Sequence, residues 1–216
     1  MAECARTNPH KHQADLAWSD FIAALQAIFE TCSDQPTQRD EQLNQLVKQR
    51  YPSLLSTPQL QQALVMCPHQ HALSTPSWAQ TLYQDSACHI GLIAVYRGQA
   101  MPLHDHTGSS GLSLVLSGRA RIRYARRMGV NPISGMTQIK LADTQECSVQ
   151  QVSGFDQQHN LHSIEAISAR AQLLVVHLPP INREKQAFYF PLEDKPWCSG
   201  QQIRTKRIRI HYNLGH

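Results

Sequence analysis

The chain has 216 residues, of which 41% are hydrophobic and 17% charged, and this composition excludes collagen-like, coiled-coil and wholly disordered proteins. Its length suits a single domain with an appendage, because domains commonly hold about 100–150 residues and β-barrels reach about 200–250. The formal net charge of +4 equals the charge of residues 201–216 alone, so the remainder is neutral and is not a polyanion-binding protein.

The six cysteines lie far apart in the sequence and form no Cys-x-x-Cys pair. A chain of this size does not need disulfides for stability, so the pattern favours a reducing compartment. The first residues lack the apolar stretch of a signal peptide, and no segment approaches the roughly 18 apolar residues of a membrane span. We therefore expect a cytoplasmic protein that binds neither membrane nor nucleic acid, and we leave its oligomeric state open.

Helical periodicity dominates the first third of the chain. Over residues 15–30 the apolar residues recur at the i, i+3, i+4 and i+7 positions that form one stripe of a helix. A second stripe covers residues 43–47, and the pair Thr57-Pro58 is typical of the start of a third helix. Residues 1–75 are therefore predicted to form an N-terminal α-helical cap that is part of the same unit as the remainder.

From residue 76 onward apolar and polar residues alternate, which is the period of a β-strand. The runs are short and are separated by Gly, Pro, Asn and Ser, which favours a β-sandwich or barrel over residues 76–195. The predicted strands are His89–Tyr96, Leu112–Leu116, Ala120–Tyr124, Cys147–Val152, Leu161–Ile167 and Leu173–Leu178. Residues 196–216 are predicted to be a basic C-terminal tail, to which we assign no function.

Two histidines, His104 and His106, stand two residues apart just before one of these alternating runs. On a strand, residues i and i+2 point to the same side, so both imidazoles would face one space and could chelate one metal ion. A third ligand has to come from elsewhere in the chain. His162, on a later predicted strand, is the best candidate, because a barrel brings distant strands face to face.

The spacing around this histidine pair resembles the first sequence motif of the cupin superfamily. Four residues fall on the motif: Gly98, His104, His106 and Gly118. Gly111 stands where cupins carry a glutamate. The resemblance implies a mainly β fold, a cupin-type β-barrel (jelly roll), here with the N-terminal α-helical cap in front of it.

The glycine at position 111 changes the charge of the predicted metal site. Three neutral imidazoles leave a divalent ion its full double positive charge and several open positions. Such an ion attracts anionic ligands, and it would hold a bound thiol as the thiolate. The missing carboxylate is therefore compatible with oxidation of a thiol by O2.

Within the cupins, the chain most resembles the thiol dioxygenases of the cysteamine dioxygenase and plant cysteine oxidase family, which are related to cysteine dioxygenase. The segment Pro102-Leu-His104-Asp-His106 is similar to the family's Pro-Leu-His-Asp-His, and Asn160-Leu-His162 is similar to its Gly-Asn-x-His. The resemblance implies a mononuclear non-haem Fe(II), held by these three histidines, and insertion of both atoms of O2 into a thiol to give a sulfinate. Ni, Mn or Zn could replace iron in the purified protein. The family's substrates are small aminothiols and N-terminal cysteines of peptides.

Three further residues are predicted to act near this site. His177 could be a catalytic hydrogen-bond partner or acid/base just outside the metal ligands, or an ordinary histidine at a strand edge. Tyr83 is a candidate for lining the substrate pocket. Arg97 is a candidate for binding a substrate carboxylate, because the stretch Gln80–Tyr83 lacks the arginine that cysteine dioxygenases carry there.

These observations favour an enzyme, an Fe(II)- and O2-dependent dioxygenase of a small aminothiol or cysteine-type thiol. Two alternatives stay open: a non-catalytic metal-containing cupin that senses or binds a small molecule, and a cupin dioxygenase of a non-thiol substrate. The sequence does not distinguish among cysteamine, cysteine, 3-mercaptopropionate and a peptide with an N-terminal cysteine. The expected partners are a small-molecule thiol and O2.

Overall fold

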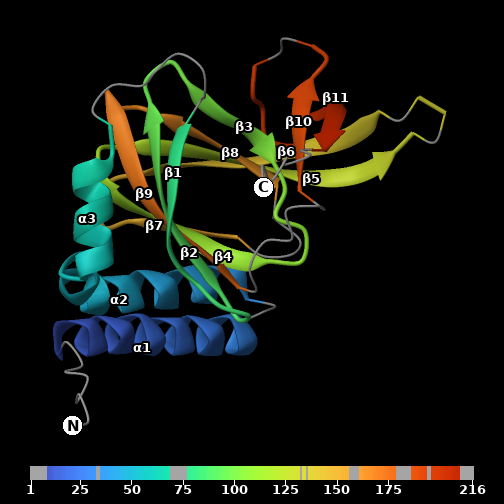
Figure 1. Cartoon of the computed structure of the whole chain (residues 1–216). Coiled ribbons are helices and arrows are strands. Elements are labelled where there is room, and N and C mark those ends of the chain that lie inside the picture. The colour runs from blue at the N-terminus through green and yellow to red at the C-terminus, as the bar shows by residue number, and fades with distance from the viewer. Residues whose placement is uncertain are drawn as a thin grey trace, which may run out of the picture. The chain divides into compact units, whose positions relative to one another are not determined.

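The computed structural model describes residues 9–32, 35–68, 77–131, 133–134, 136–155, 161–178, 186–193 and 196–209. Within them the chain is mainly β, with three helices followed by strands that include a closed barrel, so the predicted fold class is confirmed. The chain divides into two compact units, Met1–Cys67 with the helices and Pro68–His216 with the strands (Figure 1). The predicted boundary at residues 75 and 76 lies outside the described residues.

Three helices form the described part of the N-terminal unit: α1 (Pro9–Thr31), α2 (Pro36–Leu55) and α3 (Pro58–Met66). Each begins at a proline, which suits the first helical turn because an N–H there would have no partner within the helix. The apolar stripes expected from the sequence are buried, among them Trp18, Phe21, Leu25, Leu43, Val47 and Leu60. None of the described helices is both long and apolar enough to cross a membrane.

The described strands of the second unit form two antiparallel assemblies. A five-stranded sheet has the order β1-β2-β9-β4-β7, and a closed barrel has the order β10-β11-β6-β5-β8-β3. The strands are β1 (Ser77–Gln84), β2 (His89–Tyr96), β3 (Ala100–His104), β4 (Ser110–Ser117), β5 (Ala120–Val130), β6 (Thr137–Cys147), β7 (Val152–Phe155), β8 (Leu161–Ala166), β9 (Arg170–Leu178), β10 (Ala187–Pro191) and β11 (Gln202–Arg209). In Figure 1 the β5–β6 hairpin extends beyond the other strands of this unit.

Two apolar cores follow from the alternation of side chains along these strands. One combines residues of the five-stranded sheet and of the barrel, including Ile93, Val115, Ile122, Ile164 and Leu173. The other fills the closed barrel with residues such as Leu103, Ala125, Ile139, Leu161, Tyr189 and Ile203. On β8, Leu161 belongs to the barrel core and Ile164 to the core shared with the sheet. Because side chains alternate, His162 shares the side of Ile164 that faces the five-stranded sheet.

The segment between β6 and β7 differs from the sequence prediction. Residues 148–151, expected within a strand, form a turn in which Gln150 has a positive φ of 67°. The amide of Gln151 donates to the carbonyl oxygen of Ser148 and closes this turn. The alternation of Ser, Val and Gln in this segment is the pattern of a β-strand, but Val149 is 45% exposed and the segment buries no apolar face.

The predicted basic tail contains strand β11, which closes the barrel between β10 and β6. Its buried residues Ile203 and Thr205 alternate with the exposed residues Arg204 and Lys206. Because arginine and lysine are frequent in this segment, its composition predicted a solvent-exposed end of the chain. The structure shows instead that one face of the strand is buried. The tail thus contributes a structural element to the barrel.

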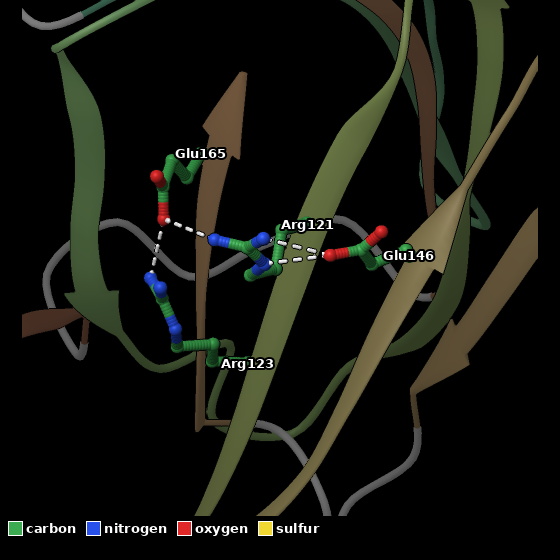
Figure 2. A network of polar contacts seen from close by, with 4 residues as sticks. All are labelled: Arg121, Arg123, Glu146 and Glu165. Atoms are coloured by element: carbon green, nitrogen blue, oxygen red, sulfur yellow. Dashed lines mark hydrogen bonds and ion pairs between the residues drawn. The ribbon is translucent and has the colours of Figure 1, made fainter. Parts of the chain in front are cut away.

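An ion-pair network on β5, β6 and β8 ties β5 to both of its neighbours (Figure 2). Arg121 contacts Glu146 of β6 at 2.7 Å, and Arg123 contacts Glu165 of β8 at 2.6 Å. Glu165 also lies 3.7 Å from Arg121. These side chains are partly exposed, so each contact contributes about 1 kcal/mol or less. The network supports the register of β5 with the strand that carries His162.

Candidate metal centre

Two of the predicted ligands are partners on neighbouring strands. His104 ends β3 and His162 lies on β8, and the two are paired in the antiparallel register. His106 follows just after β3, and its ring centroid lies 4.7 Å from that of His104 and 4.9 Å from that of His162. All three side chains are buried. The structure therefore brings the three histidines together, with β3 and β8 as adjacent strands rather than opposite walls.

The spacing of the ring nitrogens suits a single cation. The ligand atoms of the three histidines all lie within 4.8 Å of one another, and Nε2 of His106 is 3.4 Å from Nε2 of His162. Two nitrogens bound to one ion at ~2.1 Å stand about 3.0 Å apart in octahedral and about 3.4 Å apart in tetrahedral geometry. The residues present thus fit one metal ion with imidazole ligands, a donor set that suits Fe, Ni, Cu and Zn.

The protonation of these rings leaves lone pairs for a metal. Nδ1 of His104 donates a 2.8 Å hydrogen bond to the carbonyl oxygen of Pro102, so its Nε2 carries the lone pair. Burial lowers the pKa of His104, and burial together with the neighbouring imidazoles lowers the pKa values of His106 and His162 well below the usual value. Nδ1 of His106 and Nδ1 of His162 are buried without a hydrogen-bond partner among the described residues. The cluster is therefore neutral at pH 7, as metal ligation requires.

A buried aspartate fixes the loop between His104 and His106. Oδ1 of Asp105 accepts a hydrogen bond from the amide of Ala187 at 2.9 Å, and Oδ2 accepts one from the hydroxyl of Tyr189 at 2.6 Å. The amide of Asp105 donates to the carbonyl oxygen of Ala187 at 3.1 Å. Tyr189 belongs to the core of the barrel, so the carboxylate is directed there rather than toward the imidazoles. Strand β10 thereby holds the backbone that spaces the two histidines.

Packing explains why position 111 carries a glycine. Gly111 lies on β4 opposite His177 of β9, where a Cβ would stand 1.9 Å from the carbonyl oxygen of Val176 and 2.7 Å from Cζ of Phe155. The ring of Phe155 is buried, with its centroid 5.2–5.4 Å from the rings of three histidines of the site. Backbone and aromatic ring therefore occupy the volume that a glutamate side chain would need.

A fourth buried imidazole, that of His177, lies beside the cluster. Its ring centroid is 4.6 Å from that of His106, and its Nδ1 is 3.4 Å from Nδ1 of His89. Nε2 of His89 in turn lies 3.1 Å from Oγ1 of Thr81. The sequence indicated His177 but missed His89, because only the register of β2 against β9 joins two residues that are 88 positions apart.

The other two predicted site residues lie farther from the cluster. Tyr83 lies on β1, which is separated from β9 by β2, and its hydroxyl donates a 2.8 Å hydrogen bond to Asp85. Arg97 follows β2 at the end opposite to His89, roughly 25 Å away at the usual rise per residue of a strand. It is exposed and donates to the carbonyl oxygen of Ile167 at 3.1 Å. Substrate contact by either residue stays a prediction.

The histidine cluster lies within the part of the chain that matches a known family. Residues 53–207, more than two thirds of the chain, match the model of the family named PCO_ADO, which covers plant cysteine oxidases and cysteamine dioxygenases. The chain belongs to this family. Asn160, one of the residues that carried the resemblance in the sequence, lies outside the described residues.

Membership of the PCO_ADO family confirms the predicted resemblance and indicates an oxidoreductase of the dioxygenase type. The family is metal-dependent, and the three-histidine cluster could hold the metal. The matched region reaches from α2 into β11, so it also includes most of the strand that the sequence assigned to a tail. No curated protein sequence matches the chain.

Several solved structures are similar to about half of this PCO_ADO chain. KdgF from a Halomonas species is 11% identical, with a TM-score of 0.39 and coverage of 50% of this chain and 85% of that one. A cupin superfamily protein from Desulfitobacterium hafniense is 18% identical, with a TM-score of 0.36 and coverage of 50% and 83%. A protein from Thermus thermophilus is 19% identical, with a TM-score of 0.41 and coverage of 54% and 94%.

Proposed function

We propose that the protein is a non-haem Fe(II)-dependent dioxygenase that converts a small aminothiol or cysteine-type thiol to a sulfinate. The observation that carries the proposal is the convergence of three buried imidazoles, with ligand atoms within 4.8 Å, in a chain of the PCO_ADO family. The reaction combines RSH with O2 to give RSO2H. The O–O bond breaks and two S–O bonds form, sulfur supplies all the electrons that oxygen takes up, and no external reductant is needed.

In this reaction, the three histidines and Asp105 would have different roles. His104, His106 and His162 would hold the ion, and ferrous iron, when bound, would supply the redox chemistry that joins a thiolate to O2. Because the ligands are neutral, the site attracts the anionic form of the thiol. Asp105 keeps the ligand loop in place through its bonds to β10. The three imidazoles are buried, so a sulfur bound at their ion would have little contact with bulk water.

We further propose that the partners are a small-molecule thiol and O2 and that the protein is located in the cytoplasm. We also propose that the N-terminal helices and the barrel act as one functional unit. Support for a reducing compartment comes from the cysteines of the described residues, none of which is in a disulfide: Cys32, Cys67, Cys88, Cys147 and Cys198. Iron is proposed as the working metal because non-haem iron activates O2 and because the resemblance to the PCO_ADO family implies Fe(II).

Oxygen consumption tests the proposed function. The purified protein is loaded with Fe(II) in the absence of oxygen and then mixed with O2 and, separately, cysteamine, cysteine, 3-mercaptopropionate or a peptide with an N-terminal cysteine. We expect O2 uptake with at least one thiol, and mass spectrometry should show both atoms of isotopically labelled O2 in the sulfinate. Uptake without labelled sulfinate, or no uptake with any thiol, would contradict the proposal.

Matched alanine variants connect this activity with the cluster. His104→Ala, His106→Ala and His162→Ala should each lose iron binding and O2 uptake. Lys140→Ala, at an exposed position of β6 between two buried residues, should retain both. Tight iron binding without turnover of any thiol would favour the alternative of a metal-containing binding protein. Turnover of a non-thiol substrate alone would favour a different cupin dioxygenase.

A further inference from the structure

An apolar row leads away from the histidine cluster along the outer face of β10. Phe188 is the register partner of His104, and the centroids of the two rings are 5.8 Å apart. The ring of Phe190 follows, with its centroid 6.5 Å from that of Phe188. Because Tyr189 between them belongs to the barrel core, both phenylalanines lie on the opposite, outer face of the strand. The row therefore begins at a proposed metal ligand and continues toward the surface.

Two further apolar residues extend this row. Ile208 of β11 pairs with Phe188, and the amide of Leu192, just after β10, donates to the carbonyl oxygen of Arg204. Phe190, Leu192 and Ile208 are 41–47% exposed, although each is large and apolar. Neighbouring exposed apolar side chains on one face mark a surface that binds another molecule. We call Phe188, Phe190, Leu192 and Ile208 the outer-face row.

The outer-face row ends beside a cavity at the base of the β5–β6 hairpin. Arg204, next to Leu192, pairs with Gln138 of β6 at this point (Figure 1). Both residues line a cavity of about 290 Å³, to which Val130 and Met136 add apolar walls. Sites for small molecules commonly measure about 300–1,000 Å³, so this cavity suits one large side chain of a bound molecule.

Positive charge flanks the row. The described strands β10 and β11 contain no acidic residue. Lys206 pairs with Phe190 and is exposed, and Arg204 lies at the cavity. Glu193 forms an ion pair with Arg204 at 2.9 Å, but exposed ion pairs are weak, so a bound carboxylate can share the guanidinium. The charges therefore favour a partner with acidic side chains.

The length of the row decides between a small thiol and a longer molecule. Phe188 and Leu192 are four residues apart, which corresponds to about 13 Å at the usual rise of a strand. A thiol as small as cysteamine, bound at the histidines, cannot reach from there to Leu192. An extended polypeptide with its first residue at the histidines would reach Arg204 after about five or six residues.

Two other occupants fit this face less well. A flat lipid membrane could contact the exposed part of the row, but it could not enter the cavity or approach His104, which is buried. A second copy of the chain, docked through the same face, would bring Arg204 and Lys206 of both copies together, and like charges oppose association. A polypeptide with acidic residues matches the row, the cavity and the charges together.

We propose that the outer face of β10 and β11 is a docking surface for a polypeptide substrate whose first residue is the reacting cysteine, and that this surface selects the residues that follow. Apolar side chains of the polypeptide pack on the outer-face row, and an acidic side chain pairs with Lys206 or Arg204. An apolar side chain about five or six residues after the cysteine enters the cavity. The assignment to a substrate rests on the proposed function, whereas binding of such a polypeptide to this face does not.

Kinetics with two synthetic peptides test the charge preference. Both have ten residues, an N-terminal cysteine and a leucine at the sixth position; one carries glutamates and the other lysines at the third and seventh positions. With iron-loaded protein, kcat/KM for the glutamate peptide should exceed that for the lysine peptide by about tenfold or more. Lys206→Glu should remove or invert this ratio, whereas Lys48→Glu, at an exposed position of α2, should keep it. Equal kcat/KM values for the two peptides, or equal effects of the two variants, would overturn the proposal.

Two variants of exposed residues test the outer-face row. Phe190→Ser and Ile208→Ser should each raise KM for the glutamate peptide by about three- to tenfold, because apolar contact area is lost. KM for the dipeptide Cys-Gly should stay within about twofold, since this thiol is too short to reach either residue. Val65→Ser on α3, which removes an exposed apolar side chain elsewhere, should change neither value. An unchanged KM for the glutamate peptide in both row variants would overturn the docking surface.

Binding to the metal-free protein gives a readout that does not depend on turnover. The glutamate peptide, with serine in place of its cysteine and a fluorescent group at its C-terminus, should bind, and Lys206→Glu should weaken its affinity about tenfold. A photoreactive group at the sixth position should crosslink to Val130 or Met136 at the cavity. Absence of binding, or crosslinks to other parts of the chain alone, would overturn the proposal. If the iron-loaded protein oxidises no thiol, the proposed function fails, and these measurements still decide the docking surface.

Three other results would also overturn the proposal. Oxidation of cysteamine without oxidation of either peptide would remove the assignment to a polypeptide substrate. Vesicles of phosphatidylcholine and phosphatidylserine that bind the wild-type protein but not Lys206→Glu, in the absence of peptide binding, would assign this face to a membrane. Dimers in analytical ultracentrifugation that Ile208→Ser dissociates would assign it to a second copy of the chain. We expect peptide oxidation, no vesicle binding and no such dimer.

Discussion

The ring of Phe155 lies against the imidazole of His106, with 5.2 Å between the ring centroids and 29° between the ring planes. The same ring is 5.3 Å from that of His162 and 5.4 Å from that of His177. Its Cζ also lies 2.7 Å from the place where a Cβ on Gly111 would stand. One aromatic side chain therefore supports the spacing of three imidazoles and closes the space between them and β4.

Truncation of Phe155 should loosen the histidine cluster. Phe155→Ala leaves a cavity beside three imidazoles, so we expect a loss of about 3–5 kcal/mol in the free energy of unfolding and weaker metal binding. Phe155→Leu keeps much of the volume and should lose about 1–2 kcal/mol. Urea unfolding and cobalt titration of the metal-free protein measure both effects. Equal metal affinity in the two variants would show that the ring does not space the imidazoles.

The hydroxyl of Tyr189 should contribute to metal affinity through Asp105. Tyr189→Phe leaves a buried carboxylate oxygen without its 2.6 Å hydrogen bond, which should cost about 1–3 kcal/mol of stability and roughly tenfold in metal affinity. Tyr83→Phe is the matched control, because it removes an exposed hydrogen bond to Asp85 and should leave metal affinity unchanged. A metal titration in which the two variants behave alike would argue against a role for β10 in holding the ligand loop.

Alanine at position 111 should not be tolerated. The Cβ would meet the carbonyl oxygen of Val176 at 1.9 Å, and backbone cannot move aside as a flexible side chain can. We expect Gly111→Ala to lose more than about 3 kcal/mol or to fail to fold. Gly129→Ala on β5, where a Cβ would meet nothing within 4 Å, should change stability by less than about 1 kcal/mol. Thermal unfolding of both variants measures the difference. Equal melting temperatures of the two variants would contradict this expectation.

The buried histidines should make the metal-free protein sensitive to acid. Burial lowers the pKa values of His106, His162 and His177 well below the usual value of 6.5, and that of His104 below it. As the pH falls, these histidines therefore take up protons in the unfolded chain at a higher pH than in the folded protein. Stability is fully present above the unfolded pKa and is lost below it, by at most about 1.4 kcal/mol per pH unit for each histidine.

Urea unfolding at several pH values between about 7.5 and 5 measures this loss. Saturation with zinc should move the loss to lower pH, because bound metal competes with protons for the same nitrogens. His177→Gln should reduce the slope without removing it. A free energy of unfolding that does not change over this range would mean that the imidazoles take up protons in the folded protein.

The strands that the sequence predicted best are those with the most continuous burial. On β4 and β9 nearly every residue is buried, and their apolar runs stand out from the neighbouring turns. Strand β6 escaped notice because its buried inner face includes Thr137 and its second half is exposed. Strand β11 escaped because charged side chains fill its outer face. Alternation is visible in a sequence only where the inner residues are apolar and numerous.

The candidate ligands could be predicted, whereas the residues that support them could not. The pair His104 and His106 can be recognised from a two-residue spacing within one segment. His162 can be predicted because it lies in an alternating run that is expected to form another strand of the barrel. The contact of His89 with His177 depends on the register of two strands, and the bond from Tyr189 to Asp105 depends on the pairing of β10 with β3. No spacing within one segment encodes such contacts.

Strand β11 pairs with β10 along one edge and with β6 along the other. A version of the protein that stops before Gln202 would leave the amide and carbonyl groups of both neighbours without partners, and bare strand edges recruit other chains. Strand β11 thus protects the molecule from self-association. Shortened versions should be recovered as insoluble aggregates that no longer retain the metal, rather than as a smaller working enzyme.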